Sequence, residues 1–425
     1  MISKAEAVAL ANTALQGDDV AGFRQLLDRS PELRAGINEP ISHFDSPLIT
    51  RVRSEAMLEV LLEAGADINA RSKWWAGGFG LLDTAEPALA ACAIRRGATV
   101  TIHAAARLGM IDRVKELIAA DPALVRARGG DGQTPLHFAS TIEIAEFLLD
   151  QGADINARDV DHESTPAQYM VRSRPEIARF LVRRGAKSDI LMAAALGDLG
   201  LVDKHLQDDP ECIRMRVNDQ SFPKTNFHSG GAIYQWELGW HVSACQVARS
   251  FGHPEVLDLL MERCPADEKL LNACWLHHEV LVKSLVAAHP NLAANLSSEG
   301  RRQLAHAARN NNPTAARLML AAGLPVESFG QHHATPLHWA AWHGNAELVR
   351  LILTYNPPIE NSDNDYKVTP LNWALHGSQN GWYRETGDYP ATVEVLLNAG
   401  ARLPEALWGT EAVQQVLRRH GLKEN

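Results

Sequence analysis

The chain has 425 residues, of which 46% are hydrophobic and 22% charged, and its formal net charge is −10 at pH 7. This balance is typical of a folded globular protein and excludes a disordered chain. Lysine and arginine form no long clusters, so we expect no nucleic-acid partner, because phosphate binding needs concentrated positive charge. No apolar stretch approaches the roughly 20 residues that cross a bilayer, so we expect no membrane segment.

The start of the chain and its cysteines both favour the cytoplasm. Residues 1–6 hold no cationic run ahead of a long apolar core, so we expect no secretory signal. The five cysteines are scattered and odd in number, which fits free thiols in a reducing compartment. We therefore expect a cytoplasmic protein.

Two phrases recur along the chain. The first, Leu-Leu-x-x-Gly-Ala-Asp-Ile-Asn-Ala, stands at Leu61–Ala70 and again at Leu148–Ala157. The second, Thr-Pro-Leu-His, stands at Thr134–His137 and Thr335–His338, and with Asn in place of His at Thr369–Asn372. Self-similarity of this kind predicts a solenoid, in which each unit buries its apolar face against its neighbours.

Each part of the repeated unit has a mechanical role. Thr134 supplies an N-cap hydroxyl, and Pro135 suits the first helical position, where its missing N–H costs nothing. The run from Ile144 gives a second helix its apolar stripe, and Gly152 is expected to end that helix in the left-handed conformation. The phrases therefore predict a two-helix hairpin.

These phrases resemble the ankyrin repeat, and the best single copy begins at Thr335. The resemblance implies an all-α ankyrin-repeat solenoid of about a dozen units, near one per 33 residues. It also implies a role in recognition. Weaker hairpins are predicted to start near Ala5, Ser46, Thr101, Thr165, Ile190, Ser243, Glu268 and Arg301.

We divide the chain into four parts. Residues 1–200 form an N-terminal repeat array, and 201–264 a divergent repeat with a long aromatic insertion. Residues 265–403 hold C-terminal repeats with an insertion at 376–389, and 404–425 form a helical cap.

A longer period accompanies the repeats. Gly97 and Gly185, and likewise Gly109 and Gly197, lie 88 residues apart. We expect each pair at matching positions in hairpins separated by the same number of units, and we expect the helix-ending glycines in the left-handed region.

Three departures from the repeat supply candidate site residues. Aligning the two long phrases sets Trp74 and Trp75 opposite Asp161 and His162, at the tip of the loop between units. Two tryptophans there indicate either a ligand or partner contact or local packing over a neighbouring loop.

The second departure is the stretch 218–241, which separates two helices that ordinarily lie a few residues apart. Loops this long inside an array are usually functional or disordered, and this one is too aromatic for disorder. It forms either a binding site or a hairpin packed on its neighbours. Its candidate residues are His228, Tyr234, Trp236, Glu237, Trp240 and His241.

The third departure is the insertion 375–389, between the two helices of one unit. Alignment sets His376 against Trp342, near the end of the inner helix, which in the ankyrin fold opens onto the concave groove. We expect Trp342, His343, His376, Trp382 and Tyr383 to line one surface. We also predict that the second and third departures form opposite walls of one site.

Histidines within the repeated phrase are assigned a structural role. His137 and His338 occupy the phrase's own position, where the imidazole bridges backbone groups, and His103 is expected to do the same. The histidines outside it remain open between structure and function.

Sequence motifs for catalysis and metal binding are absent. There is no paired Cys-x-x-Cys, no His-Glu-x-x-His, no Gly-x-Ser-x-Gly and no phosphate-binding glycine loop, so we expect no metal and no cofactor. Four carboxylates near aromatic or histidine residues leave proton chemistry open, as in many sugar sites. They are Asp83, Glu163, Glu237 and Asp388.

Two functional hypotheses follow. In the first, the protein recognises a protein partner or small polar ligand on an aromatic, acidic, concave face. In the alternative, it is an enzyme, namely a lyase, isomerase or hydrolase acting on a small polar substrate such as a sugar, with a pocket built from the insertions. Whether it is an enzyme stays open at this point.

Overall fold

A computed structural model describes residues 3–423. Over this range the chain folds into 25 α-helices and six 3-10 helices, with two isolated β-bridges and no strand. The helices pair into twelve hairpins, seven in the first part and five in the second, followed by one last helix. The predicted all-α ankyrin solenoid of about a dozen units is confirmed. None of the described helices is long and apolar enough to cross a membrane.

The internal contacts divide the chain into two compact units, which we describe separately. Unit 1 comprises residues 1–242 and unit 2 residues 243–425. The four-part division drawn from the sequence stays a prediction.

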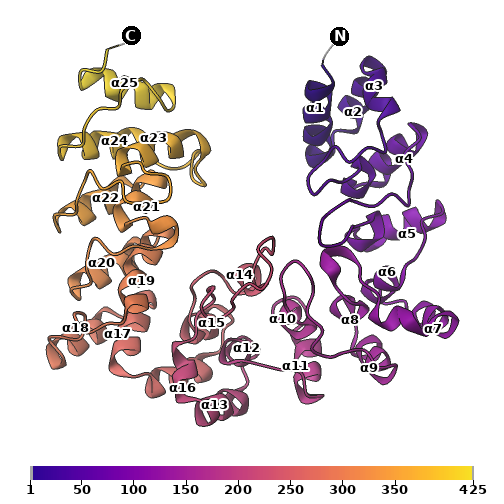
Figure 1. Cartoon of the computed structure of the whole chain (residues 1–425), viewed down its shortest axis with the longest axis horizontal. Coiled ribbons are helices and arrows are strands. Elements are labelled where there is room, and N and C mark those ends of the chain that lie inside the picture. Colours follow the sequence, from indigo (N-terminus) through magenta and orange to yellow (C-terminus); the bar gives the residue numbers. More distant parts are fainter. Residues whose placement is uncertain (1–2, 424–425) are drawn as a thin grey trace. The chain divides into compact units, whose positions relative to one another are not determined.

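Unit 1 is a succession of helical hairpins, labelled along the chain in Figure 1. In two of them the first helix is only a 3-10 turn. The hairpins are α1 (Lys4–Gly17) with α2 (Val20–Arg29); η1 (Leu48–Arg51) with α4 (Glu55–Glu63); η2 (Leu81–Asp83) with α5 (Pro87–Arg95); α6 (Ile102–Arg107) with α7 (Ile111–Ala120); α8 (Pro135–Phe138) with α9 (Ile142–Asp150); α10 (Pro166–Met170) with α11 (Pro175–Arg183); and α12 (Ile190–Leu196) with α13 (Leu199–Asp208). Short helices lie in the connections: α3 (Pro31–Ala35), η3 (Pro122–Arg126), η4 (Gly130–Gly132), η5 (Pro210–Arg214) and α14 (Tyr234–Glu237).

Unit 2 continues the same pattern with longer helices (Figure 1). Its hairpins are α15 (Ala244–Ser250) with α16 (Pro254–Arg263); α17 (Ala266–Trp275) with α18 (Glu279–Ala288); α19 (Ser298–Arg309) with α20 (Pro313–Ala321); α21 (Pro336–Trp342) with α22 (Ala346–Leu353); and α23 (Pro370–Asn380) with α24 (Tyr389–Asn398). The turn η6 (Gln331–His333) precedes α21, and α25 (Glu411–Arg419) ends the unit.

The repeated phrase starts its helices where expected, at Pro135 for α8 and at Pro336 for α21. The hydroxyl of Thr335 accepts the capping hydrogen bond from the N–H of His338, whereas that of Thr134 contacts the Nδ1 atom of His137 instead. Gly65 (φ 91°) and Gly152 (φ 88°) follow α4 and α9 in the left-handed region, as predicted.

The 88-residue period is also confirmed. Gly97 and Gly185 both have φ 97° and follow the second helices of hairpins three units apart. Gly109 (φ 74°) and Gly197 (φ 68°) lie between the helices of hairpins that are again three apart.

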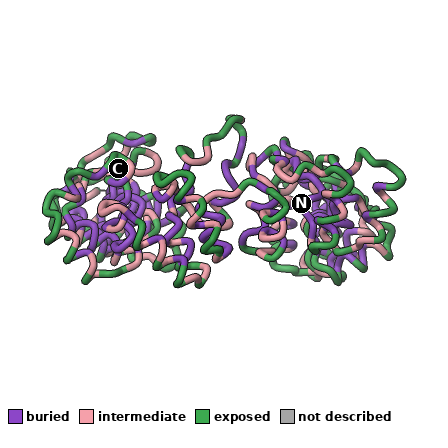
Figure 2. Tube along the Cα trace, turned by 90° about the horizontal axis from the view of Figure 1, so that it is seen from below, coloured by how far each residue is buried: buried purple, intermediate pink, exposed green. Residues whose placement is uncertain are grey.

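The core of each unit runs along its stack of hairpins, and exposed residues follow the turns (Figure 2). First helices are covered by neighbouring hairpins, so all seven residues of α12 are buried. Second helices bury only a stripe, as in α9, where Ile144, Ala145 and Leu148 are inside. The alanines of the first helices let neighbouring hairpins approach closely.

Histidines of the repeated phrase bridge backbone segments, as predicted. The Nε2 atom of His137 lies 3.1 Å from the carbonyl oxygen of Ser164, and that of His338 lies 3.1 Å from the carbonyl oxygen of Asn361. His103 makes the same kind of contact with the carbonyl oxygen of Ala127, at 3.1 Å. Burial lowers the pKa of His137 to about 3 and that of His338 to about 4.

Candidate functional site

In unit 1, hydrogen bonds join several of the loops between hairpins near Asp131. Its carbonyl oxygen accepts hydrogen bonds from the backbone N–H groups of Val160 (2.8 Å) and Asp161 (3.1 Å). The indole N–H of Trp74 donates to the carboxylate of Asp161 across 3.2 Å. Three different loops between hairpins therefore share one polar junction.

The two tryptophans of the first loop have different surroundings. Trp74 is half-buried and packs edge-on against Phe44, with ring centroids 5.0 Å apart. Trp75 is 41% exposed, and its ring centroid lies 5.8 Å from that of His228. Trp74 thus takes part in local packing, whereas Trp75 remains on the surface. Their contact with a ligand or partner stays a prediction.

The different surroundings predict unequal effects of substitution. Replacing Trp74 with phenylalanine should lower the free energy of unfolding of unit 1 by about 1–2 kcal/mol, because a hydrogen bond to a carboxylate is lost. Replacing Trp75 with serine should change it by less than about 0.5 kcal/mol, as for most surface positions. Hydrogen exchange of peptides covering residues 71–80 and 129–164 measures both effects. Equal losses at the two positions would contradict the assignment.

The junction also holds a group of acids beside a histidine. The Nδ1 atom of His162 lies 3.0 Å from the carbonyl oxygen of Gly231, and its Nε2 lies 4.0 Å from carboxylate oxygens of both Asp131 and Asp161. Burial, together with the nearby charge of Asp161, raises the pKa of Asp131 to about 6. This group was not predicted from the sequence, because Asp131 lies about 30 residues before Asp161 and His162 and the three follow no ligand-spacing motif.

Hydrogen bonds connect the 218–241 insertion to the preceding loops. Glu163 accepts hydrogen bonds from the backbone N–H groups of Thr225 and Asn226, at 2.9 and 2.8 Å. Tyr234 is fully buried, and its hydroxyl donates to the carboxylate of Asp189 across 3.1 Å. Tyr234 was predicted to contact a ligand, but its burial assigns it to the core.

The other predicted residues of the insertion are spread over its surface and base. His228 is exposed, and Trp236 is 58% exposed with its ring edge-on to that of His162. Glu237 and Trp240 are half-buried, and burial raises the pKa of Glu237. His241 is buried in a turn with φ 61°. Its backbone N–H donates to the carbonyl oxygen of Val217, and this hydrogen bond joins the two ends of the insertion.

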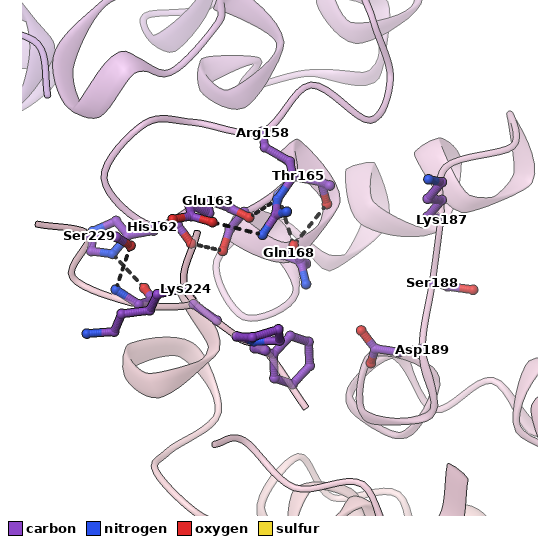
Figure 3. Close-up of a pocket in the computed structure, with 15 residues that line it drawn as sticks. Arg158, His162, Glu163, Thr165, Gln168, Lys187, Ser188, Asp189, Lys224 and Ser229 are labelled. Carbon is purple, nitrogen blue, oxygen red and sulfur yellow. Dashed lines mark hydrogen bonds and ion pairs between the residues drawn. The ribbon is translucent and has the colours of Figure 1, made fainter. Parts of the chain in front are cut away.

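A polar cavity of about 270 Å³ lies between these loops (Figure 3). Arg158 and Glu163 form an ion pair on one wall, with Nη2 and Oε2 3.5 Å apart. Asp189 on another wall already accepts hydrogen bonds from the N–H of Met192 (2.8 Å) and from Tyr234. Both carboxylates of this cavity are therefore engaged in holding loops and a helix end. Asp83 and Asp388, the remaining acids of interest, likewise accept hydrogen bonds from the backbone N–H groups of Gly80 and Ala391.

Unit 2 contains a second cavity, of about 430 Å³, which we name the aromatic pocket. Eight of its ten lining side chains carry aromatic rings, and among the described residues that line it none is an aspartate, glutamate, lysine or arginine. The lining residues are His332, Trp339, Trp342, Tyr366, Val368, Asn372, Trp373, His376, Trp382 and Trp408.

The rings of the aromatic pocket form a continuous wall. Trp339 packs edge-on against Trp373 with centroids 5.1 Å apart, and it stacks with Trp382 at 5.9 Å. His376 lies between Trp342 and Trp408, with centroid distances of 5.5 and 5.6 Å. Edge-on and offset arrangements at such distances are favourable for aromatic pairs.

The repeat period places these rings side by side. Trp339 and Trp373, like Trp342 and His376, are separated by 34 residues and occupy matching positions on α21 and α23. His332 and Tyr366, in the loops before these helices, show the same separation. Because adjacent hairpins stack in register, equivalent positions become neighbours.

A buried tyrosine positions the loop that carries Trp382. The hydroxyl of Tyr389 donates to the carbonyl oxygen of Trp342 across 2.9 Å. A β-carbon added at Gly377, Gly381 or Gly387 would lie between 2.5 and 3.1 Å from this side chain. Glycine is therefore required there for the loop to close over the ring.

The third departure differs partly from its prediction. Residues 376–380 continue helix α23, and only 381–388 form a loop. Trp342, His376 and Trp382 come together in the aromatic pocket, as we expected. His343 and Tyr383 instead line a neighbouring polar cavity.

His343 is a structural residue. It is 1% exposed, and its Nε2 lies 2.6 Å from the carbonyl oxygen of Arg309. Burial lowers its pKa to about 4. We therefore correct its assignment from a ligand contact to the framework beneath the pocket.

Five of the eight aromatic residues of the pocket were not predicted from the sequence, namely His332, Trp339, Tyr366, Trp373 and Trp408. The signal that could have found the first four is the 34-residue spacing of aromatic residues. The predicted shared site of the two insertions involves residues of both units and stays a prediction.

Comparison with known proteins agrees with the fold. A family model described as ankyrin repeats, in three copies, matches residues 102–194, and a single ankyrin-repeat model matches residues 332–364. The chain therefore contains ankyrin repeats. Ankyrin repeats in general mediate interactions between proteins.

Curated relatives share parts of the array. The chain is 24% identical over 296 residues to "E3 ubiquitin-protein ligase KEG" of Arabidopsis thaliana, which is 66% of this chain and 17% of that protein. It is 29% identical over 134 residues to "Ankyrin repeat and SAM domain-containing protein 6" of Rattus norvegicus, which is 31% of this chain and 15% of that protein. The matched region thus spans about a sixth of each relative.

Proposed function

We propose that this protein is a recognition module that binds a segment of a partner protein in the aromatic pocket of unit 2. The observation that supports this most is the exposure of large aromatic rings around one cavity. Tyr366 is 57% exposed, Trp382 58% and Trp408 41%. A gathering of exposed tryptophan and tyrosine is typical of protein interaction sites.

The binding face was predicted to be both aromatic and acidic. The exposed rings support its aromatic character, but no acidic residue among the described ones lines the pocket. Two acids beside Tyr366, Asp363 and Asp365, lie in the loop before α23 and pair with Lys367 and His332, respectively. Recognition at the pocket therefore depends on rings and hydrogen bonds rather than on negative charge.

The enzymatic alternative has less support. Catalysis by proton transfer needs a carboxylate or histidine that faces a substrate cavity and is free to exchange a proton. In unit 1, Glu163 and Asp189 hold backbone and hydroxyl groups instead. In unit 2, no carboxylate lines the described part of the aromatic pocket. Its two histidines are also engaged, His332 with Asp365 and His376 with the side chain of Asn380.

A selection experiment tests the proposed function. The immobilised full chain is presented with a phage-displayed library of random peptides, and enriched peptides are then measured against variants. Trp382→Ala should weaken their binding at least about tenfold, the loss expected for an aromatic contact residue. Trp236→Ala, a matched control on unit 1 with the same 58% exposure, should leave binding unchanged. A library that yields no binders, or binders that depend on Trp236 rather than Trp382, would overturn the proposal.

A further inference from the structure

The aromatic pocket holds hydrogen-bond donors that lack acceptors. The indole nitrogens of Trp339 and Trp342 are buried, and neither has a hydrogen-bond partner among the described residues. Trp339 as a whole is only 3% exposed. By contrast, the indole N–H of Trp275, in the same unit, donates to Gln303 across 3.1 Å. Buried indole N–H groups usually have a partner. Both nitrogens are closed to solvent in the free protein. Two unpaired donors on residues of one pocket therefore point to an acceptor that a ligand supplies when these rings turn toward it.

A positive charge already lies against two of the rings. The guanidinium carbon of Arg309 is 5.5 Å from the ring centroid of Trp339 and 5.1 Å from that of Trp382. Arg309 does not line the pocket. A cationic ligand on the same rings would therefore be repelled by this charge, and no carboxylate of the lining would compensate. The pocket accordingly disfavours lysine, arginine and quaternary ammonium groups.

The lining is also poor in hydrogen-bond acceptors. Among the lining side chains, only the amide of Asn372, the ring nitrogens of His332 and His376 and the hydroxyl of Tyr366 could accept a hydrogen bond from a ligand. A saccharide presents a donor with every hydroxyl, so many of its groups would remain unsatisfied. The best match is a ligand with exposed carbonyl oxygens, apolar rings and few N–H groups.

We infer that the aromatic pocket binds a proline-rich peptide segment in the polyproline II conformation. This inference rests on the proposed function and specifies the chemical class of the partner segment. Proline has no backbone N–H, and its carbonyl oxygens stay free in this conformation because the helix has no internal hydrogen bonds. Its ring packs on tryptophan faces, and carbonyl oxygens of the segment accept from the indole N–H groups. Aromatic grooves that take proline-rich segments follow this logic.

The groove is long enough to take more than one residue. A neighbouring cavity is lined by residues 402–408 together with Glu360, Thr369 and Asn372, and it shares Asn372 and Trp408 with the aromatic pocket. Arg402 and Glu360 lie in this extension, with Nε and Oε2 4.0 Å apart. An extended segment can therefore continue from the rings toward a polar end.

Binding measurements with defined probes test the inference. The full chain is titrated, by tryptophan fluorescence and calorimetry, with an acetylated and amidated eight-proline peptide. Three comparison probes are a glycine–serine peptide of the same length, an arginine-rich peptide and cellohexaose. We expect the proline peptide to bind at least about tenfold more tightly than the other three, and Trp339→Phe to weaken it about tenfold by removing one donor. Trp275→Phe, whose indole lies outside the pocket, should leave binding unchanged.

The outcomes separate the two proposals. Equal or tighter binding of the glycine–serine or arginine-rich peptide, lost in Trp382→Ala, would overturn the proline inference while the recognition function stands. Unweakened binding of the proline peptide in Trp339→Phe would also overturn the inference. Binding of cellohexaose alone, or of none of the four probes together with an empty peptide selection, would overturn both. Circular dichroism of each variant establishes that it is folded.

Discussion

Replacing Tyr389 with alanine is expected to lower the free energy of unfolding of unit 2 by about 3–5 kcal/mol, the usual cost of emptying a packed aromatic site. Tyr389 is 2% exposed, and its hydroxyl bonds to the end of α21. Its ring fills the space that the backbone of Gly377 and Gly387 leaves open. The loop that carries Trp382 would lose its support, so peptide binding at the aromatic pocket should fall as well.

The matched control is Tyr389→Phe, which keeps the ring and removes only the hydroxyl. It should cost about 1 kcal/mol, the worth of one hydrogen bond. Urea unfolding, read by hydrogen exchange of peptides from residues 336–398, compares the two variants. If Tyr389→Ala lowered the free energy of unfolding no more than Tyr389→Phe, the conclusion that the ring supports the loop would be wrong.

Acid should destabilise unit 2 between about pH 6.5 and pH 4. Burial lowers the pKa of both His338 and His343 to about 4, whereas an unfolded histidine titrates near 6.5. Over this window the unfolded chain binds more protons than the folded one, so stability is complete above pH 6.5 and is lost as the pH falls toward 4. Each histidine contributes up to about 3 kcal/mol, the shift multiplied by 1.36 kcal/mol per pH unit.

The variant His343→Gln tests the origin of this acid sensitivity. Glutamine does not titrate and can still donate toward the carbonyl of Arg309. The slope of unfolding free energy against pH should therefore fall by up to about 1.4 kcal/mol per pH unit in the affected window. The positive charge of Arg309 opposes protonation of His343 in the folded state and belongs to the same effect. An unchanged slope would assign the acid sensitivity to other groups.

The architecture was readable from the sequence because the repeat signals are local. A threonine cap, a proline at the first helical position and a left-handed glycine each act within one turn, so Thr134, Pro135 and Gly152 predict their hairpin without knowledge of its neighbours. The hairpin of η2 and α5 was not predicted, because its first helix is a three-residue turn that lacks the Thr-Pro-Leu-His phrase.

The candidate site was only partly readable, because burial depends on neighbouring repeats. Nothing in the local sequence distinguishes exposed Trp382 from buried His343, or exposed Trp236 from fully buried Tyr234. Trp339 and Trp373 directly follow the repeated phrases, on regular helices where aromatic residues usually belong to the core, yet they line the aromatic pocket.

The central claim is that a partner segment binds at the unpaired indoles of unit 2, and nuclear magnetic resonance of indole N–H groups tests it most directly. The chain has ten tryptophans, which can be labelled with ¹⁵N and assigned by single Trp→Phe variants. On addition of the eight-proline peptide we expect the indole signals of Trp339 and Trp342 to shift downfield as they gain acceptors, while that of Trp275, already bonded to Gln303, stays in place. Unshifted signals from Trp339 and Trp342, with shifts confined to Trp75 and Trp236 of unit 1, would contradict the account.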